Sequence, residues 1–257
     1  MIKLNIHNLK NNFYIILLGL VSSFSLPPYN LFIINFFTFS LFFIYLVKFK
    51  VSTKYKLEYF KIGWLFGFGY FISNLYWISI SLTFDDNFKF LTPFSIILVP
   101  AFMALFYGLV TYIFSYFINK EKIISSVLIY SIIFGSVELM RGYVLTGFPW
   151  NLISYSFSEE IYFIQILSLI GTYSFNIICI TLFTIPSIFI LKKSRSEIFA
   201  SLVIILIGVS FLIFGYNKIK NFNEKEIILN NYKFVIISSN ISLDRFYSND
   251  NEENIIN

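Results

Sequence analysis

Long apolar runs alternate with short polar segments along most of this chain. The seven runs lie at Phe13–Leu26, Leu31–Val47, Ile62–Phe84, Pro93–Ile118, Ile123–Leu139, Ile161–Leu191 and Ile198–Tyr216. A helix that crosses a bilayer needs about 20 residues, most of them apolar. The pattern therefore predicts about seven transmembrane helices. The sixth run exceeds that length, so we expect it to tilt, to kink at Pro186 or to begin outside the hydrocarbon.

The first run follows a polar, basic leader, Lys3–Asn12, and precedes Pro27 and Pro28. A cleaved signal peptide has the same layout, and Ser23-Phe24-Ser25 is a weak cleavage motif. Cleavage there would leave Pro27 second in the mature chain. An uncleaved first span is therefore favoured.

Three glycines lie close together in the third run, at Gly63, Gly67 and Gly69. Small residues at such spacing allow a second helix to approach closely. Glycine is also common in membrane helices in general, so this pattern alone leaves both interpretations open.

The chain changes character after Tyr216. Asn217–Asn231 is polar and is predicted to be a linker, and Tyr232–Ser238 has the β-branched and aromatic content of a strand. A single strand needs partners for its backbone groups. The sequence therefore predicts an all-α polytopic membrane protein over residues 1–216, and a linker with the first strand of an incomplete extracytoplasmic α/β domain over 217–257.

The composition indicates that the protein lies in a membrane, and it excludes several classes of site. Apolar residues make up 57% of the chain and charged residues 13%, which is typical of a membrane protein and not of a soluble domain. The net charge of +5 comes from Lys and Arg placed between the apolar runs, so no nucleic-acid partner is expected. The single cysteine, Cys179, allows no intrachain disulfide and no cysteine metal cluster. No metal or other cofactor is predicted.

The basic residues also predict the orientation. With seven spans, the clusters around Lys3, Lys54, Lys120 and Lys192 fall on one side, which the positive-inside rule makes cytoplasmic. The opposite side would hold the acidic loops and everything after Tyr216. The sequence thus predicts a multi-pass protein with a cytoplasmic N-terminus and an extracytoplasmic C-terminal tail.

One stretch combines charge with a helix break. Glu138 and Arg141 are three residues apart at the end of an apolar run, so on a helix they share one face and can neutralise each other. Pro149 lacks an amide hydrogen, which predicts a re-entrant or interfacial loop after the helix. Ionised groups at this depth usually face a protein interior or a wet cavity. The residues predicted to line such a cleft are Glu138, Arg141, Thr146, Phe148, Pro149 and Trp150. The alternative is a structural pair that fixes helix packing, with Trp150 as an interfacial anchor.

Three motifs carry a resemblance to a known family. They are Ser25-Leu-Pro-Pro-Tyr29, the stretch Gly67–Trp77, and above all Glu138-x-x-Arg-Gly-x-x-x-Thr-Gly-Phe-Pro-Trp150, followed by Gln165 and Gly171. From about Phe13 to Asn240 the chain resembles bacterial apolipoprotein N-acyltransferase. The strand around Phe234 resembles the start of that family's nitrilase-like domain, although Ser238, Ser239 and Ser242-Leu243 depart from the usual motif.

The resemblance implies an enzyme of the bacterial inner membrane. It would transfer an acyl chain from a phospholipid to the N-terminal cysteine amine of a diacylglyceryl lipoprotein, through a thioester on a cysteine assisted by a glutamate and a lysine. In the family these three residues lie in the nitrilase-like domain, beyond its first strand, and an eighth span follows. No catalytic residue is therefore assigned to this chain. Cys179 lies within a span and matches no catalytic motif.

Two functions remain open from the sequence. The first is the membrane part of an N-acyltransferase, as a truncated or a split gene product, inactive alone because the catalytic residues are missing. In the split case a second polypeptide would carry the nitrilase-like domain. The second is a non-enzymatic membrane protein such as a small-solute carrier. The carrier is disfavoured because the sequence has no internal repeat and no mid-span charges other than Glu138 and Arg141.

Overall fold

The chain folds into a bundle of helices, described here from a computed structural model that covers residues 6–49, 56–144, 147–191, 194–223 and 235. The α-helices are α1 Ile6–Ser23, α2 Ile33–Lys48, α3 Leu57–Leu75, α4 Thr92–Phe114, α5 Ile123–Arg141, α6 Ile161–Ile164, α7 Leu167–Ile170, α8 Thr172–Thr184, α9 Pro186–Leu191 and α10 Arg195–Asn223. The 3-10 helices are η1 Tyr76–Thr83, η2 Lys89–Leu91 and η3 Ile153–Phe157. The described residues contain no strand.

Among the described residues, five helical segments are long and apolar enough to cross a membrane, by length and composition. They are Leu57–Thr83, Lys89–Phe114, Ile123–Arg141, Thr172–Leu191 and Arg195–Phe222. The apolar part of α1, Asn11–Ser23, and α2 are shorter than the 18 residues that this criterion requires. The polytopic helical fold is therefore confirmed over the described residues, whereas the prediction of seven spans is not.

The sixth predicted span is divided. Gly171 has φ of +75°, a backbone conformation that suits glycine, and it ends α7 and precedes α8. The helix is interrupted again at Ile185, directly before Pro186, because proline cannot donate a backbone hydrogen bond. The break at Pro186 was an expected alternative, but the sequence did not predict the break at Gly171.

The end of the chain differs from expectation in one respect. Helix α10 continues to Asn223, seven residues beyond the predicted end of the span at Tyr216. The first part of the predicted linker is therefore helical. The predicted strand Tyr232–Ser238 lies outside the described residues, except for Val235, which is exposed and in no regular element.

Helix α3 is central to the bundle because its glycines allow close contact on two sides. A Cβ on Gly63 would lie 2.1 Å from Thr111 Oγ1 of α4, and one on Gly69 would lie 2.0 Å from the Ile16 carbonyl oxygen of α1. Any side chain would force these helices apart. The close-approach interpretation of the glycines is confirmed.

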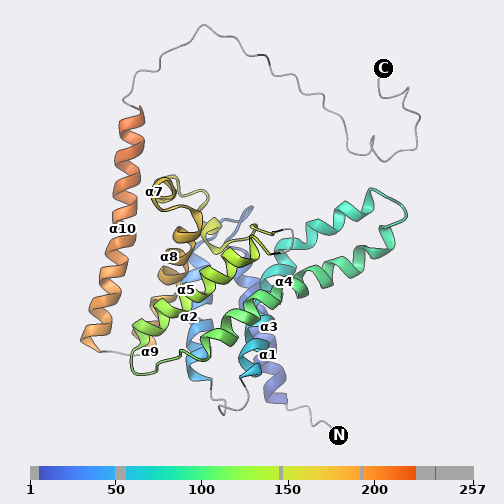
Figure 1. Cartoon of the computed structure of the whole chain (residues 1–257), viewed down its shortest axis with the longest axis horizontal. Coiled ribbons are helices and arrows are strands. Elements are labelled where there is room, and N and C mark those ends of the chain that lie inside the picture. The colour runs from blue at the N-terminus through green and yellow to red at the C-terminus, as the bar shows by residue number, and fades with distance from the viewer. Residues whose placement is uncertain (1–5, 50–55, 145–146, 192–193, 224–234, 236–257) are drawn as a thin grey trace.

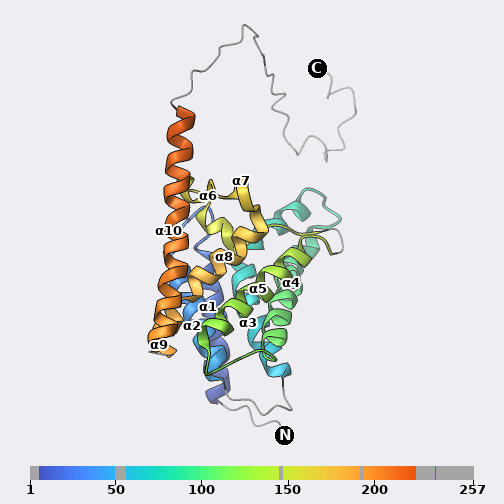
Figure 2. The ribbon, with the colours of Figure 1, turned by 60° about the vertical axis from the view of Figure 1, so that its left-hand side comes forward.

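The two ends of the bundle are distinct. The start of α1 lies at one end, and α6, α7 and the end of α10 lie at the other (Figures 1 and 2). Helix α10 runs along one side of the bundle, and α4 lies on the opposite side of α5 (Figures 1 and 2).

Near its start α10 is attached through Glu197, whose Oε2 accepts a hydrogen bond from the Ile124 backbone N–H at 2.6 Å. This carboxylate satisfies a free amide at the N-terminus of α5.

Candidate functional site

The site is built around the last turn of α5, where Glu138 and Arg141 are completely enclosed. Their relative exposures are 0% and 1%. One helical turn separates them, so both side chains point to the same face, and Arg141 Nη2 lies 3.5 Å from Glu138 Oε1. The predicted pairing is confirmed. The contact is at the long end of the hydrogen-bond range, so other groups also hold these charges.

Two other helices supply partners for the Glu138 carboxylate. Tyr107 Oη of α4 donates to Oε1 at 3.1 Å, and Asn176 Nδ2 of α8 donates to Oε2. Asn176 in turn accepts a hydrogen bond from the Ser154 backbone N–H at 2.8 Å. The carboxylate thus joins α4, α5 and α8 and indirectly fixes η3.

The guanidinium of Arg141 is only partly satisfied. Its Nη2 donates to the Trp150 carbonyl oxygen at 3.0 Å, and its Cζ lies 5.2 Å from the centre of the Phe71 ring. Its Nε and Nη1 are buried and have no hydrogen-bond partner among the described residues. Leaving such donors unpaired costs free energy. This arginine can therefore donate hydrogen bonds to a further ligand oxygen.

A small cavity of about 110 Å³ lies beside Arg141. Its other lining residues are Phe102, Met103 and Phe106 of α4 and Val144, Gly147 and Phe148 of the loop after α5. Apart from the cationic Arg141, the residues that line the cavity are apolar. Such an arrangement suits a negatively charged or carbonyl oxygen attached to an apolar group.

The loop after α5 folds back over the end of its own helix. The Phe148 backbone N–H donates to the Arg141 carbonyl oxygen at 2.9 Å. Gly147 and Asn151 adopt positive φ of 76° and 57°, which allow the tight reversal. Tyr70 Oη holds the loop by donating to the Asn151 carbonyl oxygen at 3.1 Å. The predicted loop is therefore present around Pro149.

The predicted cleft residues have different places. Glu138, Arg141 and Phe148 come together, and Phe148 shares the cavity with Arg141. Trp150 contributes its carbonyl oxygen to Arg141, whereas its ring is 50% exposed and stacks on Trp77 at 5.1 Å between centroids. The Pro149 carbonyl oxygen accepts from Tyr155 Oη at 3.2 Å. Thr146 lies outside the described residues.

Sequence reasoning missed the partners of the pair. Tyr107 and Asn176 are buried and lie inside apolar runs. A polar side chain within such a run is the feature that could have identified them as partners of the pair. Phe102, Met103 and Phe106 gave no signal, because apolar residues are expected throughout a span.

Cys179 is a free cysteine in α8 with 0% exposure. Within the part of the chain that the structure describes, no group of three or more His, Cys, Asp or Glu side chains could hold a metal ion.

Comparison with known proteins gives a consistent result. The family model "Apolipoprotein N-acyltransferase N-terminal domain" matches residues 18–185. Apolipoprotein N-acyltransferase from Brucella melitensis is 30% identical over 177 residues, and that from Rhodopseudomonas palustris is 31% identical over 178 residues. These matches cover 66% and 68% of this chain and 33% of each relative. The Rickettsia bellii relative is 36% identical over 126 residues, which cover 48% of this chain and 24% of the relative. The matched part of this chain thus corresponds to about a third of the length of the first two relatives.

Proposed function

This chain belongs to the apolipoprotein N-acyltransferase family, and we propose that it forms the membrane part of an enzyme that transfers an acyl chain from a phospholipid to the N-terminal cysteine amine of a lipoprotein. Family membership favours this function over a small-solute carrier. The proposed location is the bacterial inner membrane, with a cytoplasmic N-terminus and a periplasmic tail. The proposed domains are a transmembrane helical domain at 1–216 and a segment at 217–257 that begins the nitrilase-like domain.

The observation that carries the proposal is the buried Arg141 with two unpaired nitrogens beside an apolar cavity. A phospholipid matches both features: its phosphate and ester oxygens accept hydrogen bonds from the guanidinium, and its apolar chains suit the apolar cavity. Arginine suits phosphate because its planar fork can donate two parallel hydrogen bonds. We therefore assign Arg141 and Phe148 to the lining of a lipid cleft, with Glu138, Pro149 and Trp150 next to them. Thr146, which the sequence also predicts at this cleft, lies outside the described residues.

Within this cleft the residues have separable roles. Arg141 would contact a lipid oxygen through Nε and Nη1, the two donors that have no partner among the described residues. Glu138 would position Arg141, because its carboxylate contacts the guanidinium and is itself held by Tyr107 and Asn176. The loop from Gly147 to Trp150 would close the outer side of the cleft.

The covalent step is proposed to require residues outside this sequence. A thioester needs a thiolate with a nearby base and a group that stabilises the oxyanion. The only thiol in residues 1–257 is Cys179, which is buried in α8. We therefore propose that the catalytic cysteine, glutamate and lysine are supplied by a nitrilase-like domain, possessed by a longer chain or a second polypeptide.

Residues 1–257 expressed alone are expected to give no triacylated lipoprotein in cells depleted of their own N-acyltransferase. The measurement is mass spectrometry of lipoprotein N-termini. Acyl transfer should appear when a polypeptide with the nitrilase-like domain is co-expressed. Activity of residues 1–257 alone that disappears in Cys179→Ala would contradict the proposal.

The proposed orientation predicts the outcome of reporter fusions in intact cells. Reporters joined after Lys56, Lys122 and Lys193 should be cytoplasmic, and those joined after Asp86, Glu160 and Asn221 should be periplasmic. The short helices α1 and α2 are the critical test, because the positive-inside pattern requires both to cross. A reversed result at any one of these sites would change the number of spans.

A further inference from the structure

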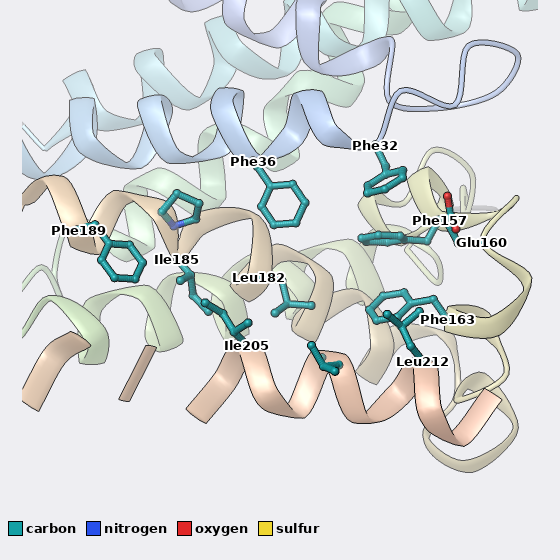
Figure 3. Close-up of a pocket in the computed structure, with 13 residues that line it drawn as sticks. Phe32, Phe36, Phe157, Glu160, Phe163, Leu182, Ile185, Phe189, Ile205 and Leu212 are labelled. Atoms are coloured by element: carbon teal, nitrogen blue, oxygen red, sulfur yellow. The ribbon is translucent and has the colours of Figure 1, made fainter. Parts of the chain in front are cut away.

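A second cavity, of about 370 Å³, lies on the side of the bundle that α10 covers. It is an elongated groove between the α2 region, α8–α9 and α10, and Phe189 and Glu160 lie toward its opposite ends (Figure 3). Its volume is within the range of about 300–1,000 Å³ found for ligand pockets. None of its lining residues lines the cavity at Arg141.

The groove exists because α10 contacts the bundle closely only in places. Towards one end Gly215 packs on α6, where a Cβ would lie 1.8 Å from the Tyr162 carbonyl oxygen. Towards the other end Glu197 binds the Ile124 amide. Between these attachments Gly208 lines the groove beside Leu182, and a Cβ on Gly208 would lie 3.2 Å from Leu182 Cδ2. Only 17% of the most apolar window of α10 is buried within the protein.

The residues that line the groove favour an apolar ligand. Apart from Glu160, the side chains that line it are apolar, including Phe36, Phe163, Ile205 and Leu212. The groove follows α10 and α8–α9, both candidate membrane spans, so lipid chains are the surrounding solvent. An acyl chain is apolar and narrow, so it can lie along this groove.

Glu160 indicates which head group accompanies that chain. Its side chain is exposed at one end of the groove, and its carboxylate has no ion-pair partner among the described residues. A carboxylate there attracts a cationic group and repels an anionic lipid. A primary ammonium also offers three hydrogen-bond donors.

We propose that this groove binds one phospholipid, with an acyl chain between α2, α8–α9 and α10 and a primary ammonium head group at Glu160. The lipid would fill the space between α10 and the bundle. It occupies a site separate from the cleft at Arg141, on a different side of the bundle, and the proposal does not depend on acyl transfer.

The test uses residues 1–257 purified in detergent and mixed with equal amounts of palmitoyl-oleoyl phosphatidylethanolamine and phosphatidylglycerol. Native mass spectrometry then measures the lipid that the protein retains. Ile205→Trp fills the groove, whereas Leu206→Trp places the same side chain on the neighbouring, exposed residue that does not line it. Ile205→Trp should lower retained phosphatidylethanolamine roughly tenfold, since excluding two methylenes has about this effect. Leu206→Trp should retain it as the unmodified protein does.

Glu160→Gln tests the head group. It should reduce the preference for phosphatidylethanolamine over phosphatidylglycerol about threefold, a value appropriate to an exposed charge pair. An unchanged preference would overturn the assignment to Glu160. Equal retention by the two tryptophan variants would overturn the groove as the binding site.

A photoreactive phosphatidylethanolamine with a diazirine in its chain tests the unmodified protein and needs no variant to fold. Peptides of α9 and α10 that contain Phe189 and Leu212 should carry the label. Labelling confined to α3 and α4, or the finding that a second copy of the chain covers α10, would overturn the proposal.

Discussion

Arg141→Lys should lower acyl transfer about 10- to 100-fold in a protein completed with its nitrilase-like domain, while accumulation of the protein changes less than twofold. Lysine keeps the positive charge but has a single nitrogen in place of the guanidinium fork. It cannot bind both the Trp150 carbonyl oxygen and a lipid oxygen in the geometry that Nη2, Nε and Nη1 provide. A lost hydrogen bond to a charged group costs about 1.5–3 kcal/mol, which corresponds to the expected range of rates.

Arg195→Lys is the matched control, because it makes the same change at an exposed arginine away from the site. It should leave both activity and accumulation unchanged. The measurement is acyl transfer per molecule that elutes as folded protein in size-exclusion chromatography. If Arg141→Lys retains full activity per folded molecule, the pair with Glu138 has only a structural role and the cleft proposal is wrong.

Glu138→Leu should destabilise the membrane domain by about 3–5 kcal/mol, the usual cost of leaving a buried charge without its partner. The substitution keeps a side chain of similar size, so the main loss is electrostatic. Tyr107 Oη and Asn176 Nδ2 also lose their acceptor, which adds to the effect. Thermal unfolding in detergent, followed by loss of the monodisperse peak, measures the change.

The double variant Glu138→Leu, Arg141→Met separates the structural and functional roles of the pair. Because it removes both buried charges, it should recover at least half of the stability lost in Glu138→Leu. It should remain inactive in acyl transfer, since the proposed lipid contact is gone. A double variant no more stable than Glu138→Leu would mean that the charge of Arg141 does not cause the destabilisation.

Hydropathy alone is sufficient to predict an all-α polytopic membrane protein, and the structure agrees over the described residues. Five segments meet the length and composition of a span. The division of Ile161–Leu191 at Gly171 could not be predicted, because the apolar run continues across it and glycine is tolerated in membrane helices. Whether a glycine breaks a helix or permits close packing, as Gly63 and Gly69 do, depends on what lies beside it.

The candidate site also has a part that could be predicted from the sequence and a part that could not. The contact between Glu138 and Arg141 could be predicted from their spacing, since residues one turn apart on a helix share a face. The groups that surround this pair depend on how the helices pack and could not be predicted from spacing. Tyr107 and Asn176 are 31 and 38 residues from Glu138 along the chain, and they reach it because α4 and α8 both pack against α5. Helix packing also produces the groove beside α10 and leaves two Arg141 nitrogens without a partner among the described residues. Spacing along the chain determines local contacts, whereas cavities and long-range partners depend on how the helices pack.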